Sequence, residues 1–186
     1  MRIIAGEFRG RRLASVGKGD PGAHLRPTTD RVRESLFNTL NGGRFGDPIE
    51  GAHVLDLFAG TGALGLEALS RGAEHVTFID DGRVAGRILR ENIQTLGCKT
   101  AVKLINRDAT RLPPADTPCQ LVFLDPPYGK GLGGKALRMA QEQGWIADKA
   151  LIVWEESEPQ EAPDGFVLLD QKRYGDTWIS FLEAQA

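Results

Sequence analysis

The chain has little cysteine or histidine and no long hydrophobic run. Its two cysteines, Cys98 and Cys119, stand far apart, and its three histidines (His24, His53 and His75) lack metal-ligand spacing. Neither a disulfide framework nor a zinc site is therefore indicated. No apolar stretch approaches the roughly 18 to 20 residues that cross a bilayer, and the first residues lack the hydrophobic region of a signal peptide. We expect a cytoplasmic protein, monomeric, with no metal and no membrane partner.

Charge is distributed unevenly along the chain. Residues 1–33 contain eight Arg and Lys against three acidic residues, a net charge of +5. Because the whole chain carries −2, the remainder carries −7. Such an asymmetry is typical of a chain that meets phosphates at one end. The alternative is a solvated basic arm that has no partner.

The N-terminal part of the chain predicts a small extension. Residues 2–13 alternate loosely around two glycines and predict a short hairpin. The run Pro27-Thr28-Thr29-Asp30 offers a hydroxyl cap and an acid for the first turn of a helix. Apolar residues follow on one face as far as Leu40, and Gly42–Gly43 predicts the end of the helix.

From His53 onward, strand and helix segments alternate, which is typical of a parallel sheet covered on both faces. The predicted strands are 53–58, 75–80, 101–106, 120–124 and 150–154, and the predicted helices are 63–70, 83–96 and 134–143. Two final strand-like runs, 166–169 and 177–182, predict an antiparallel pair at the edge. We therefore predict an α/β fold: a doubly wound, mostly parallel sheet over residues 51–186, preceded by a basic N-terminal extension over residues 1–50.

A glycine-rich segment joins the first predicted strand to the next helix. Gly60, Gly62 and Gly65 satisfy the pattern Gly-x-Gly-x-x-Gly, and Asp80 ends the second strand, where an acid can bind a ribose. A dinucleotide is therefore one candidate ligand. The pattern alone is weak, since tight strand-to-helix turns favour glycine in any doubly wound sheet.

Three acidic residues favour S-adenosylmethionine over a dinucleotide. Asp56 stands four residues before Gly60, where it would oppose a pyrophosphate but suit an ammonium and a sulfonium. Asp80 could accept hydrogen bonds from ribose hydroxyls, and Asp108 could lie near the adenine amine. All three stand at the carboxyl ends of consecutive strands, so they would share the crevice where open α/β sheets bind ligands. Each acid alone could equally be a turn residue or a helix cap.

Asp125-Pro126-Pro127-Tyr128 follows a buried strand. The two prolines stop the sheet and fix the backbone, so the Asp125 carboxylate and Pro126 carbonyl can point into the crevice. An amino group on a base is a poor nucleophile because its lone pair is delocalised into the ring. Two acceptors could hold its hydrogens and direct the lone pair toward a methyl group, while Tyr128 stacks on the flipped base. Asp125 would stabilise developing charge and accept the proton. The alternative is a purely structural role, in which the prolines end the strand and Tyr128 packs against the core.

With these motifs placed, the sequence resembles class I methyltransferases, whose fold is Rossmann-like, and more narrowly the RsmD family of 16S ribosomal RNA guanine-N(2) methyltransferases. The resemblance covers residues 2–6 with 9–11, 25–38, 56–72 and the Asp125 loop. The most specific piece is Arg-Pro-Thr-Thr-Asp-Arg-Val-Arg-Glu at residues 26–34. Asp80 departs from the family, which more often has glutamate there, but the shorter acid can still accept hydrogen bonds from a ribose.

The resemblance implies transfer of one methyl group to the 2-amino group of a guanine in small-subunit ribosomal RNA. It carries catalytic roles onto Asp125, Pro126, Pro127 and Tyr128. Cofactor contacts carry onto Asp56, Gly60, Gly62, Asp80, Asp108 and Ala109, with Thr28 and Thr29 over the methionine end of S-adenosylmethionine. The residues that could engage RNA phosphates are Arg9, Arg11, Arg12, Arg26, Arg31 and Arg33.

Several other functions stay open. An adenine-specific DNA methyltransferase shares the Asp125 chemistry but normally needs more sequence for target recognition. In protein-glutamine methyltransferases the related loop more often begins with Asn, so Asp125 argues mildly against this function. A nicotinamide-dependent oxidoreductase would use the same glycine loop, although Asp56 argues against it. A cofactor-binding module without catalysis has no supporting feature.

Overall fold

The computed structural model describes residues 1–15 and 29–185, which include a seven-stranded sheet of order β3-β2-β1-β4-β5-β7-β6. The strands are β1 (His53–Leu57), β2 (His75–Ile79), β3 (Val102–Ile105), β4 (Cys119–Leu124), β5 (Ile146–Glu156), β6 (Phe166–Tyr174) and β7 (Thr177–Ala184). The helices are α1 (Asp30–Leu40), α2 (Ala63–Ser70), α3 (Arg83–Leu96) and α4 (Leu132–Glu142), with the 3₁₀ turn η2 (Lys99–Ala101).

The sheet is mostly parallel, as the alternating pattern predicts. β1 to β5 run parallel to one another, whereas β7 lies antiparallel between β5 and β6. The predicted α/β class and the antiparallel edge hairpin are both confirmed. The predicted strand at 150–154 is the inner part of the longer β5, whose pairing with β4 is irregular between Cys119 and Leu121.

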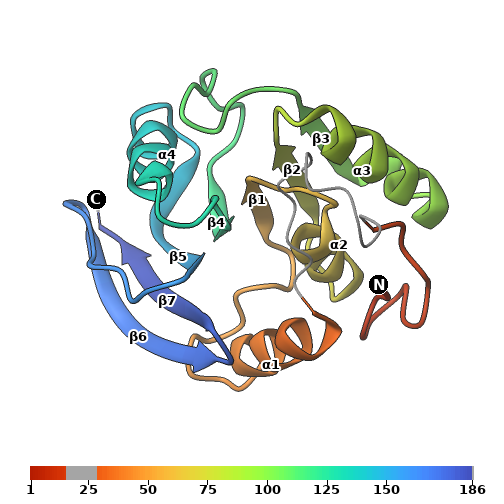
Figure 1. Cartoon of the computed structure of the whole chain (residues 1–186), viewed down its shortest axis with the longest axis horizontal. Coiled ribbons are helices and arrows are strands. Elements are labelled where there is room, and N and C mark those ends of the chain that lie inside the picture. Colours follow the sequence, from red (N-terminus) through yellow and green to blue (C-terminus); the bar gives the residue numbers. More distant parts are fainter. Residues whose placement is uncertain (16–28, 186) are drawn as a thin grey trace.

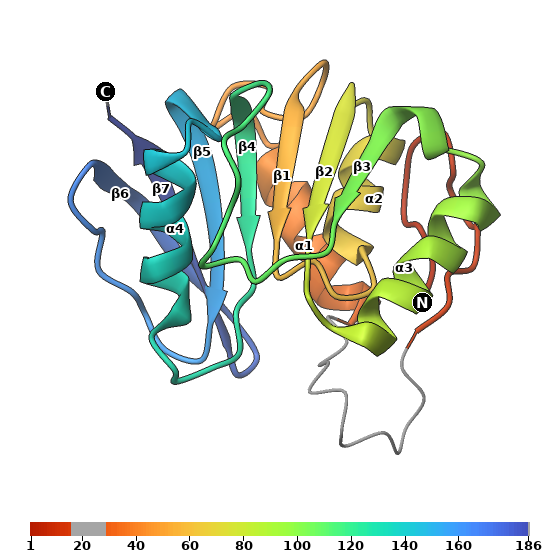
Figure 2. The same ribbon diagram turned by 90° about the horizontal axis from the view of Figure 1, so that it is seen from above.

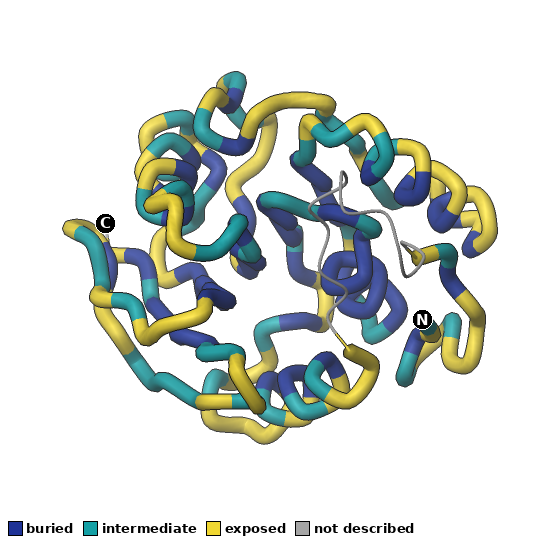
Figure 3. The backbone as a smooth tube through the Cα atoms, in the orientation of Figure 1, coloured by how far each residue is buried: buried dark blue, intermediate teal, exposed yellow. Residues whose placement is uncertain are grey.

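Helices cover both faces of the sheet (Figures 1 and 2). α1, α2 and α3 pack on one face, where a core cluster includes Phe37, Leu66 and Leu89 around Phe78 and Phe123. α4 packs on the other face, in a second cluster with the tryptophans of β5 and the segment before it. The buried residues therefore follow the central strands and the inner faces of the helices (Figure 3).

The N-terminal extension is joined to this core. Residues 1–15 fold back on themselves as the predicted hairpin, with a bridge between Arg2 and Arg12, and Ile3 and Leu13 are buried in the α1–α3 cluster. The predicted helix follows as α1: the side chain of Thr29 accepts a hydrogen bond from the Val32 amide at 3.1 Å. In the part of the chain that the structure describes, no helix is long and apolar enough to cross a membrane.

Candidate active site

The carboxyl ends of the adjacent strands β1, β2 and β4 bring the glycine loop and the Asp125 loop together. Because β1 pairs with both β2 and β4, residues that follow these strands lie at one edge of the sheet. The amide of Asp125 contacts the Leu57 carbonyl at 3.4 Å, and the amide of Ala59 donates to the Ile79 carbonyl at 3.0 Å. The two sequence motifs therefore form one site at the sheet edge.

Asp56 lies under the glycine loop and is almost fully buried, with 1% of its surface exposed. Its Oδ2 accepts a hydrogen bond from the Gly65 amide at 3.0 Å. Burial raises the pKa of Asp56 well above its ordinary value, the Gly65 hydrogen bond lowers it, and the negative Asp80 raises it further. A Cβ atom on Gly65 would lie 2.4 Å from the Phe78 ring, so the helix can approach the strand only with glycine here.

Asp80 holds the other side of the loop. Its Oδ2 accepts from the Gly60 amide at 2.9 Å and its Oδ1 from the Gly82 amide at 2.7 Å. Burial raises the pKa of Asp80, and the two amide hydrogen bonds oppose that rise. Gly60 and Gly62 adopt φ values of +58° and +84°, which favour glycine. Each carboxylate oxygen can accept a further hydrogen bond, so Asp80 keeps the capacity to bind a hydroxyl.

Asp108 and Ala109 follow β3 at the same edge. Asp108 is exposed, and its Oδ1 accepts hydrogen bonds from both the amide and the hydroxyl of Thr110, each at 2.8 Å. These two bonds lower the pKa of Asp108, so it stays ionised. Ala109 is buried and packs in the α4-side cluster. Asp108 therefore offers a charged acceptor at the surface.

The Asp125 loop is anchored by residues far along the chain. Pro126 is buried, whereas Asp125 and Tyr128 are partly exposed. The Tyr128 hydroxyl lies 3.2 Å from the hydroxyl of Thr177 on β7, and the amide of the following glycine donates to Glu156 Oε1 on β5 at 3.3 Å. Sequence reasoning missed Thr177 and Glu156, because only the folded sheet brings β5 and β7 beside this loop.

Asn92 is a further residue that the sequence did not single out. It is fully buried on α3, and its amide group donates to the carbonyls of Ala14 and Thr61, both at 3.0 Å. Its Oδ1 accepts from the Ala14 amide at 2.6 Å. One side chain therefore joins the N-terminal segment to the glycine loop. The signal available in the sequence is an asparagine on the apolar face of a helix.

The basic residues divide into exposed and buried ones. Arg9, Arg12 and Arg31 are exposed, and exposed Arg11 donates from Nη2 to the Thr95 carbonyl on α3 at 2.5 Å. Two other predicted site residues, Arg26 and Thr28, lie outside the described residues.

Arg33 contradicts the prediction that it contacts RNA. Its side chain is 0% exposed, and it pairs with Asp30 at 2.9 Å and with the buried Glu67 at 3.4 Å. It also donates to the carbonyl of Arg2. Arg33 occupies the core-facing side of α1, three and four residues before Leu36 and Phe37. Its role is to join α1 to α2 and the N-terminal segment.

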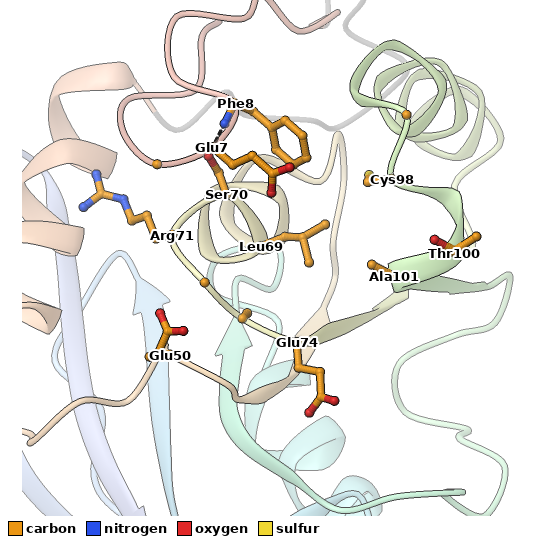
Figure 4. A pocket seen from close by; sticks show the side chains of 14 residues that line it. Glu7, Phe8, Glu50, Leu69, Ser70, Arg71, Glu74, Cys98, Thr100 and Ala101 are labelled. Atoms are coloured by element: carbon orange, nitrogen blue, oxygen red, sulfur yellow. Dashed lines mark hydrogen bonds between the residues drawn. The ribbon is translucent and has the colours of Figure 1, made fainter.

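A hollow of about 570 Å³ lies away from this edge (Figure 4). It is lined by the turn of the N-terminal hairpin and by the carboxyl ends of α2 and α3, beside the residues that precede β2. None of the predicted cofactor or catalytic residues lines it. Glu7, Glu50 and Glu74 give it acidic walls, but the described residues contain no group of three side chains suited to a metal. We do not assign the reaction to this hollow.

The sheet order, with a glycine loop after β1 and the Asp125 loop after β4, defines a class I methyltransferase fold. Residues 1–183 match the family described as Conserved hypothetical protein 95. Ribosomal RNA small subunit methyltransferase D of Escherichia coli (strain K12) is 45% identical over 153 residues, covering 82% of this chain and 72% of the relative.

Two further comparisons agree. The protein of the same name from Haemophilus influenzae is 38% identical over 181 residues, 94% of this chain and 89% of the relative. The solved structure of yhhF from Escherichia coli superposes with a TM-score of 0.83 at 39% identity, covering 100% of this chain and 98% of that one. The chain belongs to the RsmD family of ribosomal RNA methyltransferases, which confirms the resemblance seen in the sequence.

Proposed function

We propose that this chain transfers a methyl group from S-adenosylmethionine to the exocyclic 2-amino group of a specific guanine in 16S ribosomal RNA of the small subunit. The observation that carries the proposal is the position of Asp125. Asp125 directly follows β4, and β4 pairs with β1, the strand that leads into the glycine loop. The Asp125 amide contacts the end of β1, so Asp125 lies beside the glycine loop. The names of the curated relatives support a ribosomal RNA substrate.

The side chains around the glycine loop fit S-adenosylmethionine. Asp56, Asp80 and Asp108 place three acids at one edge of the sheet, and an acidic edge suits a ligand that carries an ammonium and a sulfonium. The bound cofactor would supply an electrophilic methyl group. Asp80 would accept from the ribose and Asp108 from the adenine amine, with Ala109 beside the ring. Gly60 and Gly62 would let the backbone approach the cofactor, and Thr29 would lie near its methionine end, together with Thr28.

The Asp125 loop would hold the target base. Asp125 and the Pro126 carbonyl would accept the two hydrogens of the amino group, which directs the nitrogen lone pair toward the methyl group. Pro127 would keep the loop rigid, and Tyr128, held through Thr177, would stack on the guanine. As positive charge develops on the nitrogen, the Asp125 carboxylate would stabilise it and take the proton.

The basic extension over residues 1–50 would contact RNA, while residues 51–186 hold the cofactor and the catalytic loop. Arg9, Arg11, Arg12 and Arg31 are exposed and would meet phosphates, although Arg11 also donates to the Thr95 carbonyl. We also propose a phosphate contact for Arg26, because it lies in the same basic segment of the sequence. The protein would act as a monomer in the cytoplasm, with no metal in its reaction.

The first test measures methyl transfer from labelled S-adenosylmethionine to small ribosomal subunits from a strain that lacks the enzyme. We expect label in the RNA, and we expect Asp125→Ala to lower the transfer rate by about a hundredfold or more while still binding cofactor. Asp164→Ala, at an exposed acid in the loop before β6, is the matched control. Label found only on DNA or on a release factor would refute the ribosomal assignment. An active Asp125→Ala variant would refute the role of that carboxylate.

A further inference from the structure

Three arginines form a stripe along the outer surface of α3. Arg83, Arg87 and Arg90 are all exposed, and their spacing of four and three residues places them on one face of the helix. The other face of the helix is buried, with Ala85, Ile88, Leu89, Ile93 and Leu96. We call Arg83, Arg87 and Arg90 the α3 stripe.

The charge pattern of α3 works against the stability of the helix. Arg83 is the first residue, where the helix dipole favours an acid, and the first turn contains no acidic residue. The cap, Gly82, makes no side-chain hydrogen bond. Arg87 lies four residues from Arg83 and three from Arg90, so like charges are neighbours along the stripe. A purely structural surface would not be expected to combine these unfavourable features.

The α3 stripe is also not neutralised locally. Within residues 1–15 and 29–185, none of its three guanidinium groups forms an ion pair, and Glu91 is the only acidic residue of α3. Two exposed cations elsewhere are paired: Arg44 with Asp170 at 3.2 Å and Lys103 with Asp116 at 2.9 Å. The positive field of the stripe therefore extends into solvent, where it attracts anions.

The stripe runs from the candidate site toward the N-terminal extension. Arg83 stands three residues after Asp80, and the other end of α3 carries Thr95, whose carbonyl accepts a hydrogen bond from Arg11. Figure 2 shows the N-terminal segment beside α3 at the same end of the sheet. From the first to the last arginine the helix rises by about 10 Å. One strand of a nucleic-acid duplex carries about three phosphates over such a length, at roughly 3.4 Å each.

We propose that the α3 stripe binds the phosphate backbone of the RNA substrate. The stripe would continue the proposed RNA contact of the N-terminal arginines along α3 to the carboxyl edge of the sheet, where the cofactor is proposed to bind. This inference rests on the proposed function. Because the arginines point away from the sheet, they position the RNA without touching the reacting atoms. Phosphate contacts of this kind give affinity and orientation but do not identify bases.

The test compares binding of the wild-type protein and Arg87→Gln/Arg90→Gln to small ribosomal subunits, measured without cofactor over a range of salt concentrations. We expect the double variant to bind about tenfold to a hundredfold more weakly near 0.1 M salt. We also expect the slope of log affinity against log salt to be shallower by about two. Methyl transfer at saturating subunits should stay near the wild-type rate, whereas the KM for subunits should rise.

Arg44→Gln/Lys103→Gln is the matched control, because it removes the same charge from cations that already pair with acids. The control is expected to keep the wild-type salt slope and a melting temperature close to that of the wild type. Arg87→Gln/Arg90→Gln is expected to melt no lower than the wild type, because it removes neighbouring like charges. An unchanged slope in Arg87→Gln/Arg90→Gln, or an equal loss in the control, would overturn the proposal. Since binding is measured apart from transfer, a protein that binds RNA through the stripe but methylates none would contradict only the proposed function.

Discussion

At the scale of single residues, the site keeps a carboxylate where burial disfavours its charge. Asp56 is 1% exposed, and its Oδ2 accepts a hydrogen bond from the amide of Gly65. A buried carboxylate is stabilised by a cationic ligand and is costly without one. We infer that Asp56 serves cofactor binding at the expense of the stability of the cofactor-free protein.

This inference gives a prediction for Asp56→Asn. The amide keeps the shape of the side chain and an acceptor for Gly65 but carries no charge, so the cofactor-free variant should melt at a higher temperature than the wild type near pH 8. Its affinity for S-adenosylmethionine should fall about tenfold or more, since a charged contact is lost. Thermal unfolding with and without cofactor measures both effects. Asp164→Asn should change neither, and a destabilised variant with normal affinity would contradict this role.

The pH dependence of stability has a definite sign. Because the pKa of Asp56 is raised in the folded protein, the folded state keeps this proton at pH values where the unfolded chain has lost it. The contribution of Asp56 to stability therefore falls as pH rises from the ordinary value of 3.8 through the raised pKa. The difference in free energy of unfolding between wild type and Asp56→Asn should grow over that range.

At the scale of helices and strands, the buried Glu67 organises three segments. It pairs with Arg71 at 2.9 Å and with Arg33 at 3.4 Å, and it accepts hydrogen bonds from the amides of Ile4 and Ala5. α1, α2 and the N-terminal segment therefore meet at one carboxylate. Removing a partner from such a buried pair leaves the other charge uncompensated.

We expect Glu67→Gln to lower the free energy of unfolding by about 3 kcal/mol. The variant keeps the volume of the side chain, but Arg71 loses the acid it pairs with and Arg33 keeps only Asp30 as a negative partner. Urea denaturation measures the change, and Glu91→Gln on the exposed face of α3 is the control. A loss no larger than that of Glu91→Gln would show that the network contributes little to the fold.

The sequence predicts the elements better than it predicts their contacts. Helical spacing locates α1, and the same spacing places Arg33 beside Leu36 and Phe37, so its burial was available as a signal. Its pairing with Glu67 could not be predicted from the sequence, because Glu67 is distant along the chain. The acids of the site lie at or just after the carboxyl ends of strands and could be predicted, whereas Thr177 and Asn92 reach the loops only through tertiary packing.

At the scale of the whole molecule, the fold separates two tasks. The carboxyl edge of the parallel strands holds the acids and the Asp125 loop, while the N-terminal segment and α3 present arginines to solvent at one end of the sheet. The net charge of −2 hides this division. Under the proposed function, the arginine surface would bind RNA phosphates while the carboxyl edge of the sheet binds a single base.

The most direct measurement of the central claim is the identity of the methylated product. Small ribosomal subunits from a strain that lacks the enzyme are incubated with the purified protein and S-adenosylmethionine, and the nucleosides of their RNA are analysed by mass spectrometry. We expect N2-methylguanosine to rise by at most one residue per subunit, and not to rise with Asp125→Ala. Methylation of adenine N6, or methylated protein with unmodified RNA, would contradict the account.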